Sequence, residues 1–416
     1  MLSLCHRYLS PLRIQYHRRL SLNIISAICD PSRAKNIAIV DSSGQAYSYS
    51  EICAAASHLS ENIRDHMLHV SDTKSSFAVA CFHHGSSNYV ITCLAAWMAG
   101  ASVVPLSTAH SAHELTYYID DSGADIVIYS PDLRNKLPDL KIPTLDSPNY
   151  TPPAYSTVEY ETLQYACGRI GADNTALVVY TSGTTGKPKG VVHSHKGLYH
   201  MVTSLVSAWE YSSQDRILHF LPLHHVHGIV NKLWCVLYAG GTVEFLPSAD
   251  AKGVWDRLAG LTSWCAVTAA SPPLPPTIFM AVPTVYAKML QLVKDEALDA
   301  DTLQNALGTL QGMRVMVSGS AALPGPLLQA WKALTGHVLL ERYGMTEIGM
   351  ALSNPLHGLR REGSVGSPLP QVECRIVPQD EDDRRLGRGE LRVKVRERCM
   401  WCVNADGGGG FNVGSS

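Results

Sequence analysis

The sequence predicts an α/β protein with two doubly wound sheet subdomains and an incomplete, β-rich third subdomain. Three observations support this prediction. Short apolar strands alternate with helical periods, capping-box spacings open two of the helices, and a proline-rich stretch separates two such portions. At 416 residues, and at roughly 150 residues per domain, the chain is long enough for two or three domains.

The first portion alternates helices with strands. Ser48 and Glu51 have the spacing of a capping box, in which side chains satisfy the free N–H groups at the start of a helix. Ser111 and Glu114 have the same spacing. The elements expected in this portion are helix 52–63, helix 89–98, strand 103–104, helix 115–119 and strand 126–129.

A loop at 142–155 separates the two portions, because its prolines fix φ and remove N–H donors. The second portion repeats the alternating pattern. The elements expected in it are strand 177–180, helix 198–208, strand 243–246, strand 279–282, strand 313–317 and helix 326–334.

The composition excludes several classes of protein. Lys and Arg number 34 against 36 Asp and Glu, so the formal charge of -2 provides no positive field for nucleic acid. The sequence contains no apolar run of the roughly 18 residues that a membrane-spanning helix needs. Its 11 cysteines are odd in number and too few for a disulfide scaffold, which favours a reducing compartment.

The N-terminal segment 1–29 has the composition of a mitochondrial transit peptide. It holds Arg7, Arg13, Arg18 and Arg19, and the first acidic residue is Asp30. Such a segment would be removed rather than folded, and we therefore expect a location in the mitochondrial matrix. A basic extension without a targeting role is the alternative.

A loop rich in hydroxyl groups, glycine and lysine follows strand 177–180. Its residues are Thr181, Ser182, Gly183, Thr184, Thr185, Gly186, Lys187, Pro188 and Lys189. Glycines let backbone N–H groups approach a polyphosphate, hydroxyls donate hydrogen bonds to it, and two ammonium groups offset its charge. It is not a Walker A loop, because only two residues separate Gly183 from Gly186. Composition alone also allows a surface hairpin.

In its order, this loop resembles the signature of the adenylate-forming superfamily, which includes acyl-CoA synthetases, luciferases and peptide-synthetase adenylation domains. Two further segments at matching places support the resemblance, a small-residue turn at 318–324 and a heptad at 341–347. The resemblance implies that 181–189 binds ATP and that 36–394 forms a luciferase-like large N-terminal domain.

The heptad matches the family's Tyr-Gly-x-Thr-Glu motif. The resemblance implies that Tyr343 flanks the adenine, Thr346 contacts the phosphate and Glu347 binds Mg²⁺. Lys189 is expected to act with Thr346 and Glu347 in catalysis. A carboxylate oxygen suits a hard cation, and that cation offsets triphosphate charge when a carboxylate attacks the α-phosphorus. In isolation, Glu347 would be interpreted as an exposed loop carboxylate.

Three histidines, His224, His225 and His227, lie where the superfamily has a Pro-Leu-x-His-x-x-Gly segment lining the acyl pocket. The resemblance implies that His225 and His227 contact the acid, and polar side chains here favour a small polar acid. Zinc is the alternative. Cys235 lies nearby, but no paired Cys or His spacing completes a tetrahedral site.

Arg342 directly precedes the motif tyrosine, where a cation is unusual for the superfamily. A cation beside an alkyl chain would be unfavourable, but it can bind a second carboxylate in a bidentate manner. Together with the histidines and with Ser320 of the small-residue turn, it gives a pattern that resembles malonyl-CoA synthetases. We therefore expect malonate or methylmalonate as the acid. Alternatively, Arg342 braces the loop through Glu341 or another carboxylate.

The resemblance implies an acid–thiol ligase. The acid would attack ATP to give an acyl-adenylate and pyrophosphate, and the thiol of coenzyme A would then displace AMP. The expected partners are small molecules: ATP, a dicarboxylic acid and coenzyme A. Two alternatives remain, a non-catalytic ATP- or partner-binding remnant and a ligase for another short carboxylic acid.

The family's pattern stops after Lys394. Its Gly-Asp motif, its hinge and the small C-terminal domain with the adenylation lysine are not found, and 395–416 is a divergent, glycine-rich tail. Residues 261–277 look like an insertion. We therefore expect an altered or truncated chain with impaired turnover, because the family's second domain helps to build the coenzyme A site.

Overall fold

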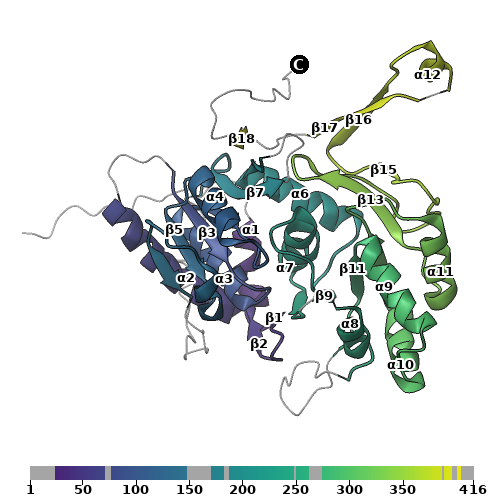
Figure 1. Ribbon diagram of the computed structural model, residues 1–416, viewed down its shortest axis with the longest axis horizontal. Helices are drawn as coiled ribbons and strands as arrows, with labels where there is room; N and C mark the ends of the chain where they lie inside the picture. Colours follow the sequence, from purple (N-terminus) through teal and green to yellow (C-terminus); the bar gives the residue numbers. More distant parts are fainter. Residues whose placement is uncertain are drawn as a thin grey trace, which may run out of the picture.

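The computed structural model describes residues 24–70, 76–147, 170–181, 187–247, 250–261, 274–386, 388–395 and 401–403. Two mixed sheets form two adjoining lobes, and a two-stranded ribbon extends from the second lobe (Figure 1). The α/β class predicted from the alternating pattern is confirmed. Within the described residues, every helix is too short or too polar to cross a bilayer.

The first sheet has the strand order β18-β8-β7-β4-β3-β5-β6. Its five strands from β7 to β6 run parallel, whereas β7 and β8 form an antiparallel hairpin. The bounds are β3 (Ala78–Phe82), β4 (Ser102–Pro105), β5 (Ile126–Tyr129), β6 (Thr144–Asp146), β7 (Thr175–Thr181), β8 (Lys189–Ser194) and β18 (Trp401–Val403). The expected phosphate loop is therefore the tip of a hairpin.

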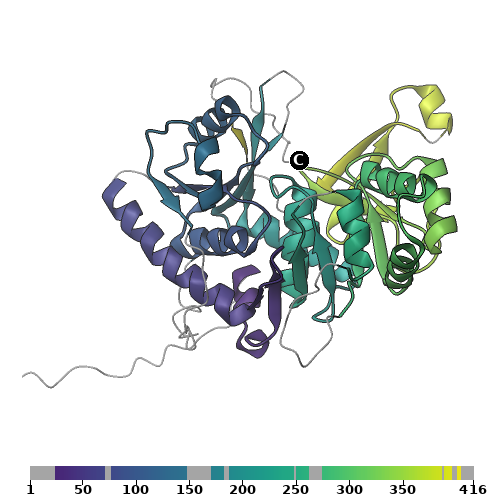
Figure 2. The ribbon, with the colours of Figure 1, turned by 60° about the horizontal axis from the view of Figure 1, so that its bottom comes forward.

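Capping boxes begin two helices of the first lobe. Helix α2 (Tyr49–Val70) runs along the outside of this lobe and packs against α3 (Ser87–Ala99) (Figure 2). At its start, Ser48 N donates to Glu51 Oε2 at 2.7 Å, and Glu51 N donates to Ser48 Oγ at 3.3 Å. Ser111 caps α4 (Ala112–Ser122) in the same way. Both predicted capping boxes are confirmed.

The second sheet has the order β15-β14-β13-β12-β11-β9-β10-β1-β2. Its central strands run parallel, and β2, β14 and β15 add antiparallel edges. The bounds are β1 (Ile37–Val40), β2 (Ala46–Ser48), β9 (Arg216–His219), β10 (Thr242–Phe245), β11 (Ile278–Ala281), β12 (Val315–Ser318), β13 (Leu340–Met345), β14 (Gly349–Ser353) and β15 (Ser367–Pro368).

Helices α8 (Ala251–Leu258), α9 (Pro283–Lys294), α10 (Ala300–Gln311) and α11 (Gly325–Thr335) bury one side of the second sheet. Trp331 of α11 packs edge-on against Tyr286 of α9, with ring centroids 4.8 Å apart. The remaining elements are η1 (Pro31–Arg33), η2 (Pro131–Lys136), the π-helix η3 (His227–Trp234), α1 (Ile24–Ile28), α6 (His195–Ala208), α7 (Cys235–Ala239), α12 (Glu381–Leu386), β16 (Val372–Val377) and β17 (Glu390–Val395). One apolar core continues between the two sheets and includes η3.

The sheets do not divide at 142–155 as the sequence suggested. Strand β6 (Thr144–Asp146) lies within this stretch, which was expected to be a loop, and it belongs to the same sheet as β7, which follows the stretch. The early strands β1 and β2 belong to the other sheet. These pairings join strands far apart in the chain, so no local periodicity encodes them. Residues 148–169 lie outside the described part of the chain.

The expected transit segment 1–29 overlaps the folded domain. Ile24, Ile25 and Ile28 of α1 are buried in the core, and Arg33 Nη1 donates to Ala27 O at 3.1 Å and to Tyr238 O at 2.6 Å. The boundary at residue 29 is thus corrected, because composition carries no information about which isoleucines pack. Residues 1–23 lie outside the described part of the chain.

The structure describes only part of the divergent tail at 395–416 and only part of the expected insertion at 261–277. Within 395–416, the segment Trp401–Val403 pairs antiparallel with β8 and so covers an edge that would otherwise present unpaired backbone groups. Residues 404–416, and residues 262–273 of the expected insertion at 261–277, lie outside the described residues.

Candidate active site

The β7–β8 hairpin holds the ends of the expected ATP-binding loop. Thr181 pairs across the hairpin with Lys189, and its Oγ1 donates to Lys189 O at 3.5 Å. Tyr117 Oη on α4 donates to Pro188 O at 2.8 Å. Lys187 is exposed and Lys189 is half-buried, whereas 182–186 lie outside the described residues. The loop leaves the sheet at the carboxyl end of β7, where open α/β sheets bind ligands.

The expected adenine and magnesium contacts lie where β13 turns into β14. Tyr343 is 38% exposed on β13, and Thr346 and Glu347 are half-buried in the turn that follows. A Cβ on Gly344 would overlap the carbonyl oxygen of Gly349, so the bend requires glycine there. The turn leaves an aromatic ring, a hydroxyl and a carboxylate within reach of a ligand.

Strand β8 and helix α6 connect this turn to the hairpin. Burial lowers the pKa of His193 on β8 to about 4, and an interaction with the Thr346 backbone partly offsets that effect. Met201 on α6 packs so closely on Gly349 that a Cβ there would overlap its sulfur. Strand β8, which belongs to the hairpin, therefore also contacts the turn after β13. These are the two segments expected to bind one nucleotide.

Ser320 joins two of the expected acid-binding side chains. Arg342 Nη2 donates to Ser320 Oγ at 3.2 Å, and His227 Nδ1 lies 3.1 Å from the same oxygen. The three residues come from β13, the turn after β12 and the start of η3. Ser320 has a φ of 68°, which is strained for a residue other than glycine and is typical of functional sites.

Arg342 is a buried cation without an anionic partner among the described residues. The residue is 5% exposed, and burial lowers its pKa to about 10, so the guanidinium is charged at neutral pH. Its Nε has no hydrogen-bond partner within the described chain. The Glu341 carboxylate instead interacts with the backbones of Leu323 and Gly363, which argues against the brace through Glu341. A buried lone charge is unfavourable, so this position suits an anionic ligand.

His227 provides a neutral donor beside the guanidinium. Burial lowers its pKa well below the usual range, and the positive charge of Arg342 acts in the same direction. Ser320 Oγ accepts from Arg342 and can donate its proton to His227 Nδ1, which places the imidazole proton on Nε2. That Nε2 is buried and has no partner among the described residues.

His225 lies beside this cluster. It is exposed, its ring centroid is 4.1 Å from that of His224, and the His224 ring is 5.4 Å from that of His110. His225 is close enough to influence the pKa of His227. Among the described residues, no group of three His, Cys, Asp or Glu side chains is placed to hold a metal ion, so the zinc alternative gains no support.

Sequence reasoning missed three residues of this region. A Cβ on Gly319 would lie 2.5 Å from Arg342 Cζ, and a Cβ on Gly228 would overlap the carbonyl oxygen of Pro222. Lys232 is fully buried in η3. The sequence did contain signals that could have identified them: two glycines within the motifs, and a single lysine in the apolar stretch 229–237.

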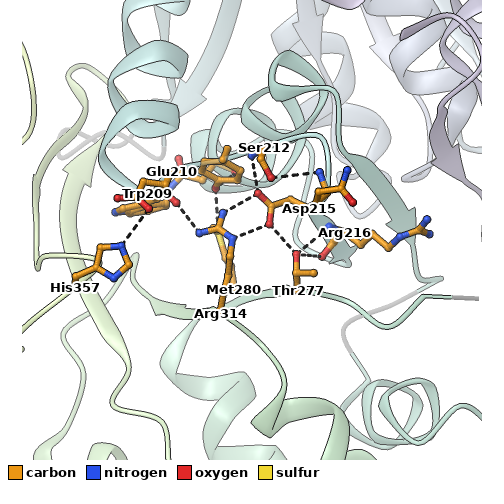
Figure 3. Close-up of polar contacts among 12 residues, drawn as sticks. Trp209, Glu210, Ser212, Asp215, Arg216, Thr277, Met280, Arg314 and His357 are labelled. Carbon is orange, nitrogen blue, oxygen red and sulfur yellow. Dashed lines mark hydrogen bonds and ion pairs between the residues drawn. The ribbon is translucent and has the colours of Figure 1, made fainter.

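A polar network fixes the other end of β12 (Figure 3). Arg314 Nε donates to Asp215 Oδ1 at 2.7 Å and Arg314 Nη2 donates to Asp215 Oδ2 at 2.8 Å. Arg314 Nη1 donates to Trp209 O at 2.7 Å, and Thr277 Oγ1 donates to Asp215 Oδ1 at 2.8 Å. Since Arg314 immediately precedes β12, this network helps to fix the strand that leads into the turn holding Ser320.

Comparison with known proteins agrees with this arrangement. The curated protein malonate–CoA ligase ACSF3, mitochondrial, from Xenopus laevis is 40% identical over 355 residues, which cover 84% of this chain and 60% of that protein. A malonyl-CoA ligase ternary product complex with methylmalonyl-CoA and AMP is 29% identical, with a TM-score of 0.73 over 92% of this chain and 74% of that one. ATP-bound MatB from Rhodopseudomonas palustris is also 29% identical, with a TM-score of 0.71 over 92% and 72% of the two chains.

The chain spans about three fifths of the length of the curated relatives that it matches. Residues 31–396 match the family described as AMP-binding enzyme. This match includes the second sheet, the first sheet except β18, the hairpin loop, the Ser320 cluster and the turn at Glu347. The chain therefore belongs to the AMP-binding enzyme family.

Proposed function

We propose that this chain is an acid–thiol ligase that activates malonate or methylmalonate with ATP and transfers the acyl group to coenzyme A. The observation that carries the proposal is the buried guanidinium of Arg342, which shares Ser320 with His227 and lacks a carboxylate partner among the described residues. A dicarboxylate supplies the missing anion, whereas a monocarboxylate leaves the charge uncompensated. Relatives named malonate–CoA ligase and malonyl-CoA ligase support the same acid class.

We infer that ATP lies between the β7–β8 hairpin and the turn after β13. Thr181, Lys187 and Lys189 supply hydroxyl and ammonium donors for phosphate oxygens. Tyr343 offers its exposed ring to the adenine, and Thr346 adds a further donor. The contact between β8 and the Thr346 backbone supports a shared nucleotide site.

Glu347 fits a magnesium ion whose coordination is completed by phosphates. Mg²⁺ commonly takes one or two carboxylates together with phosphate oxygens and water. Glu347 is a half-buried carboxylate next to Thr346, and no larger cluster of acidic ligands occurs among the described residues. When bound, the ion would neutralise triphosphate charge during displacement of pyrophosphate.

The acid-binding cluster would act by positioning. Arg342 and the imidazole of His227 hold the distal carboxylate, so that the proximal carboxylate is free to attack the α-phosphorus of ATP. Pyrophosphate leaves, and the sulfur of coenzyme A then attacks the acyl carbon and releases AMP. Neither step requires a covalent bond to the protein, so orientation and charge neutralisation provide the catalysis.

An ATP–pyrophosphate exchange assay tests this proposal directly. We expect malonate to stimulate exchange at least about tenfold more than propionate, which corresponds to ~1.4 kcal/mol of discrimination. Binding of ATP without malonate-dependent exchange would instead support a non-catalytic ATP-binding protein. Equal stimulation by both acids would support a ligase for another short acid.

We also propose a location in the mitochondrial matrix. The arginine-rich, acid-free composition of residues 1–23 supports it, as does the mitochondrial relative from Xenopus laevis. Full-length chain carrying a C-terminal reporter should co-purify with mitochondria and resist added protease, and deletion of 1–23 should abolish both. An unchanged distribution after deletion would contradict targeting by this segment.

A further inference from the structure

Lys232 places a second buried cation next to the acid-binding cluster. Its side chain is 0% exposed, its Nζ donates to Met280 O at 2.8 Å, and the same nitrogen lies 3.8 Å from the centre of the Phe220 ring. No carboxylate among the described residues pairs with it. The carbonyl and the ring face stabilise an ammonium only in part, so its charge remains available to a ligand.

The position of Lys232 ties it to His227. Lys232 follows His227 by about one turn of the π-helix, and its charge acts on the rings of both His227 and His219. His227 in turn shares Ser320 with Arg342. Two buried basic side chains, Arg342 and Lys232, therefore flank one neutral imidazole.

The interior around η3 also contains unused polar groups. Asn231 is 0% exposed, and neither its amide nitrogen nor its oxygen has a partner within the described residues. The same is true of His227 Nε2 and Arg342 Nε. Buried polar groups are rarely left unpaired, and π-helical turns are frequent at functional sites. The interior around η3 is therefore suited to binding a polar ligand.

We propose that Lys232 is a positioning residue that makes the acid site selective for dicarboxylic acids, by supplying a second positive charge behind His227. This inference rests on the proposed function and goes beyond it. Without a ligand, the described site contains two buried basic side chains, Arg342 and Lys232, and no acidic partner for either. The distal carboxylate of malonate balances that charge at Arg342, whereas the uncharged tail of propionate does not, so Lys232 acts on the acid through the local field rather than by contact.

The charge of Lys232 should itself depend on ligand and pH. Burial lowers the pKa of Lys232 well below its usual range, and a bound dicarboxylate raises it again. The titratable groups that face it are His219 on β9 and His227 on η3, with Arg342 beyond His227, whereas its contacts on β11 and at Phe220 are uncharged. Malonate binding should therefore weaken as Lys232 loses its proton.

Calorimetric binding of malonate and of propionate to the full chain tests this inference. Lys232→Met removes the charge and keeps an unbranched apolar side chain. We expect about tenfold weaker malonate binding, unchanged or tighter propionate binding, and a higher Tm because an uncompensated charge has left the core. Lys252→Met, which alters an exposed lysine of α8 paired with Asp256, should change neither affinity.

The outcomes separate the inference from the proposed function. If the wild-type chain binds malonate no better than propionate, the dicarboxylate function fails, and the inference fails with it. If the wild type prefers malonate and Lys232→Met keeps the same preference, only the inference is overturned. A second measurement uses the wild type and so does not depend on folding of the variant. Because burial lowers the pKa of Lys232, the malonate preference should decline as the pH rises toward the ordinary pKa of lysine, and a constant preference would overturn the inference.

Discussion

A Cβ placed on Gly319 would lie 2.5 Å from Cζ of Arg342. The guanidinium therefore occupies the space that any side chain at position 319 would need. Gly319 follows the last residue of β12, and Arg342 lies on the neighbouring strand β13. Each is one residue beyond the parallel pair Ser318–Glu341. Absence of a side chain at Gly319 is thus what allows Arg342 to reach Ser320.

Gly319→Ala should displace the guanidinium and weaken malonate binding. Because a displacement of about 1 Å can cost about a hundredfold in a positioned site, we expect a loss of that order with ATP affinity unchanged. Isothermal titration with each ligand measures the two effects. Gly308→Ala in α10 is a matched control, since nothing lies within 4 Å of its added Cβ. Full malonate affinity in Gly319→Ala would contradict this account.

Arg342→Met should reduce kcat/KM for malonate by roughly a hundredfold or more, from about 2–5 kcal/mol of lost charge pairing. Propionate should be affected much less, because it has no distal carboxylate. Arg342→Lys should restore only part of the malonate activity, since an ammonium cannot form the bidentate contact. An equal loss on both acids would refute selective recognition by this residue.

The sequence predicted most of the elements because their signals are local. The strand 126–129 and the two capping boxes agree with the structure residue for residue. The sequence did not predict which sheet each strand joins. Strand β7 pairs with β4 in the first sheet, whereas the early strand β1 pairs with β10 in the second. Such pairings depend on the whole chain, and a periodic pattern contains no information about partners.

The residues of the proposed acid-binding cluster could be predicted from the sequence, but their arrangement in space could not. The motifs pointed to His225, His227, Ser320 and Arg342, and hydrogen bonds through Ser320 join the last three. His225 lies beside them and is exposed. The contribution of Gly319 depends on how closely two strands approach, which spacing does not reveal. Lys232 was overlooked because a lysine normally remains exposed, and only the fold shows that it is buried.

Arg314→Met should destabilise the protein without a direct effect on ligands. Asp215 is 2% exposed and Arg314 is 30% exposed, so removal of Arg314 leaves a buried carboxylate that has lost its cation. We expect a loss of about 3 kcal/mol in the free energy of unfolding, measured with urea. Lys252→Met, which removes an exposed ion pair with Asp256, should cost less than about 0.5 kcal/mol. Similar values for the two variants would show that the network in Figure 3 is not important for stability.

Acid should unfold the protein, because several histidines are buried in the neutral form. Burial lowers their pKa values, to about 3 for His83 and His219 and to about 4 for His193 and His195. The unfolded chain, with histidine pKa values near ~6.5, therefore binds protons first as the pH falls. Stability is complete above about pH 6.5 and declines toward pH 4, by about 2 kcal/mol per histidine at pH 5.

Replacing one of these histidines should reduce that dependence. His195 begins α6 and packs its ring edge-on against Trp97, with centroids 5.7 Å apart. His195→Phe keeps an aromatic ring there and removes the proton site. The stability lost between about pH 7.5 and about pH 5 should therefore shrink by about 2 kcal/mol, as followed by urea unfolding at each pH. The exposed His113 provides the control, because His113→Gln should leave the loss unchanged. If His195→Phe loses as much stability as the wild type, protonation of His195 does not drive acid unfolding.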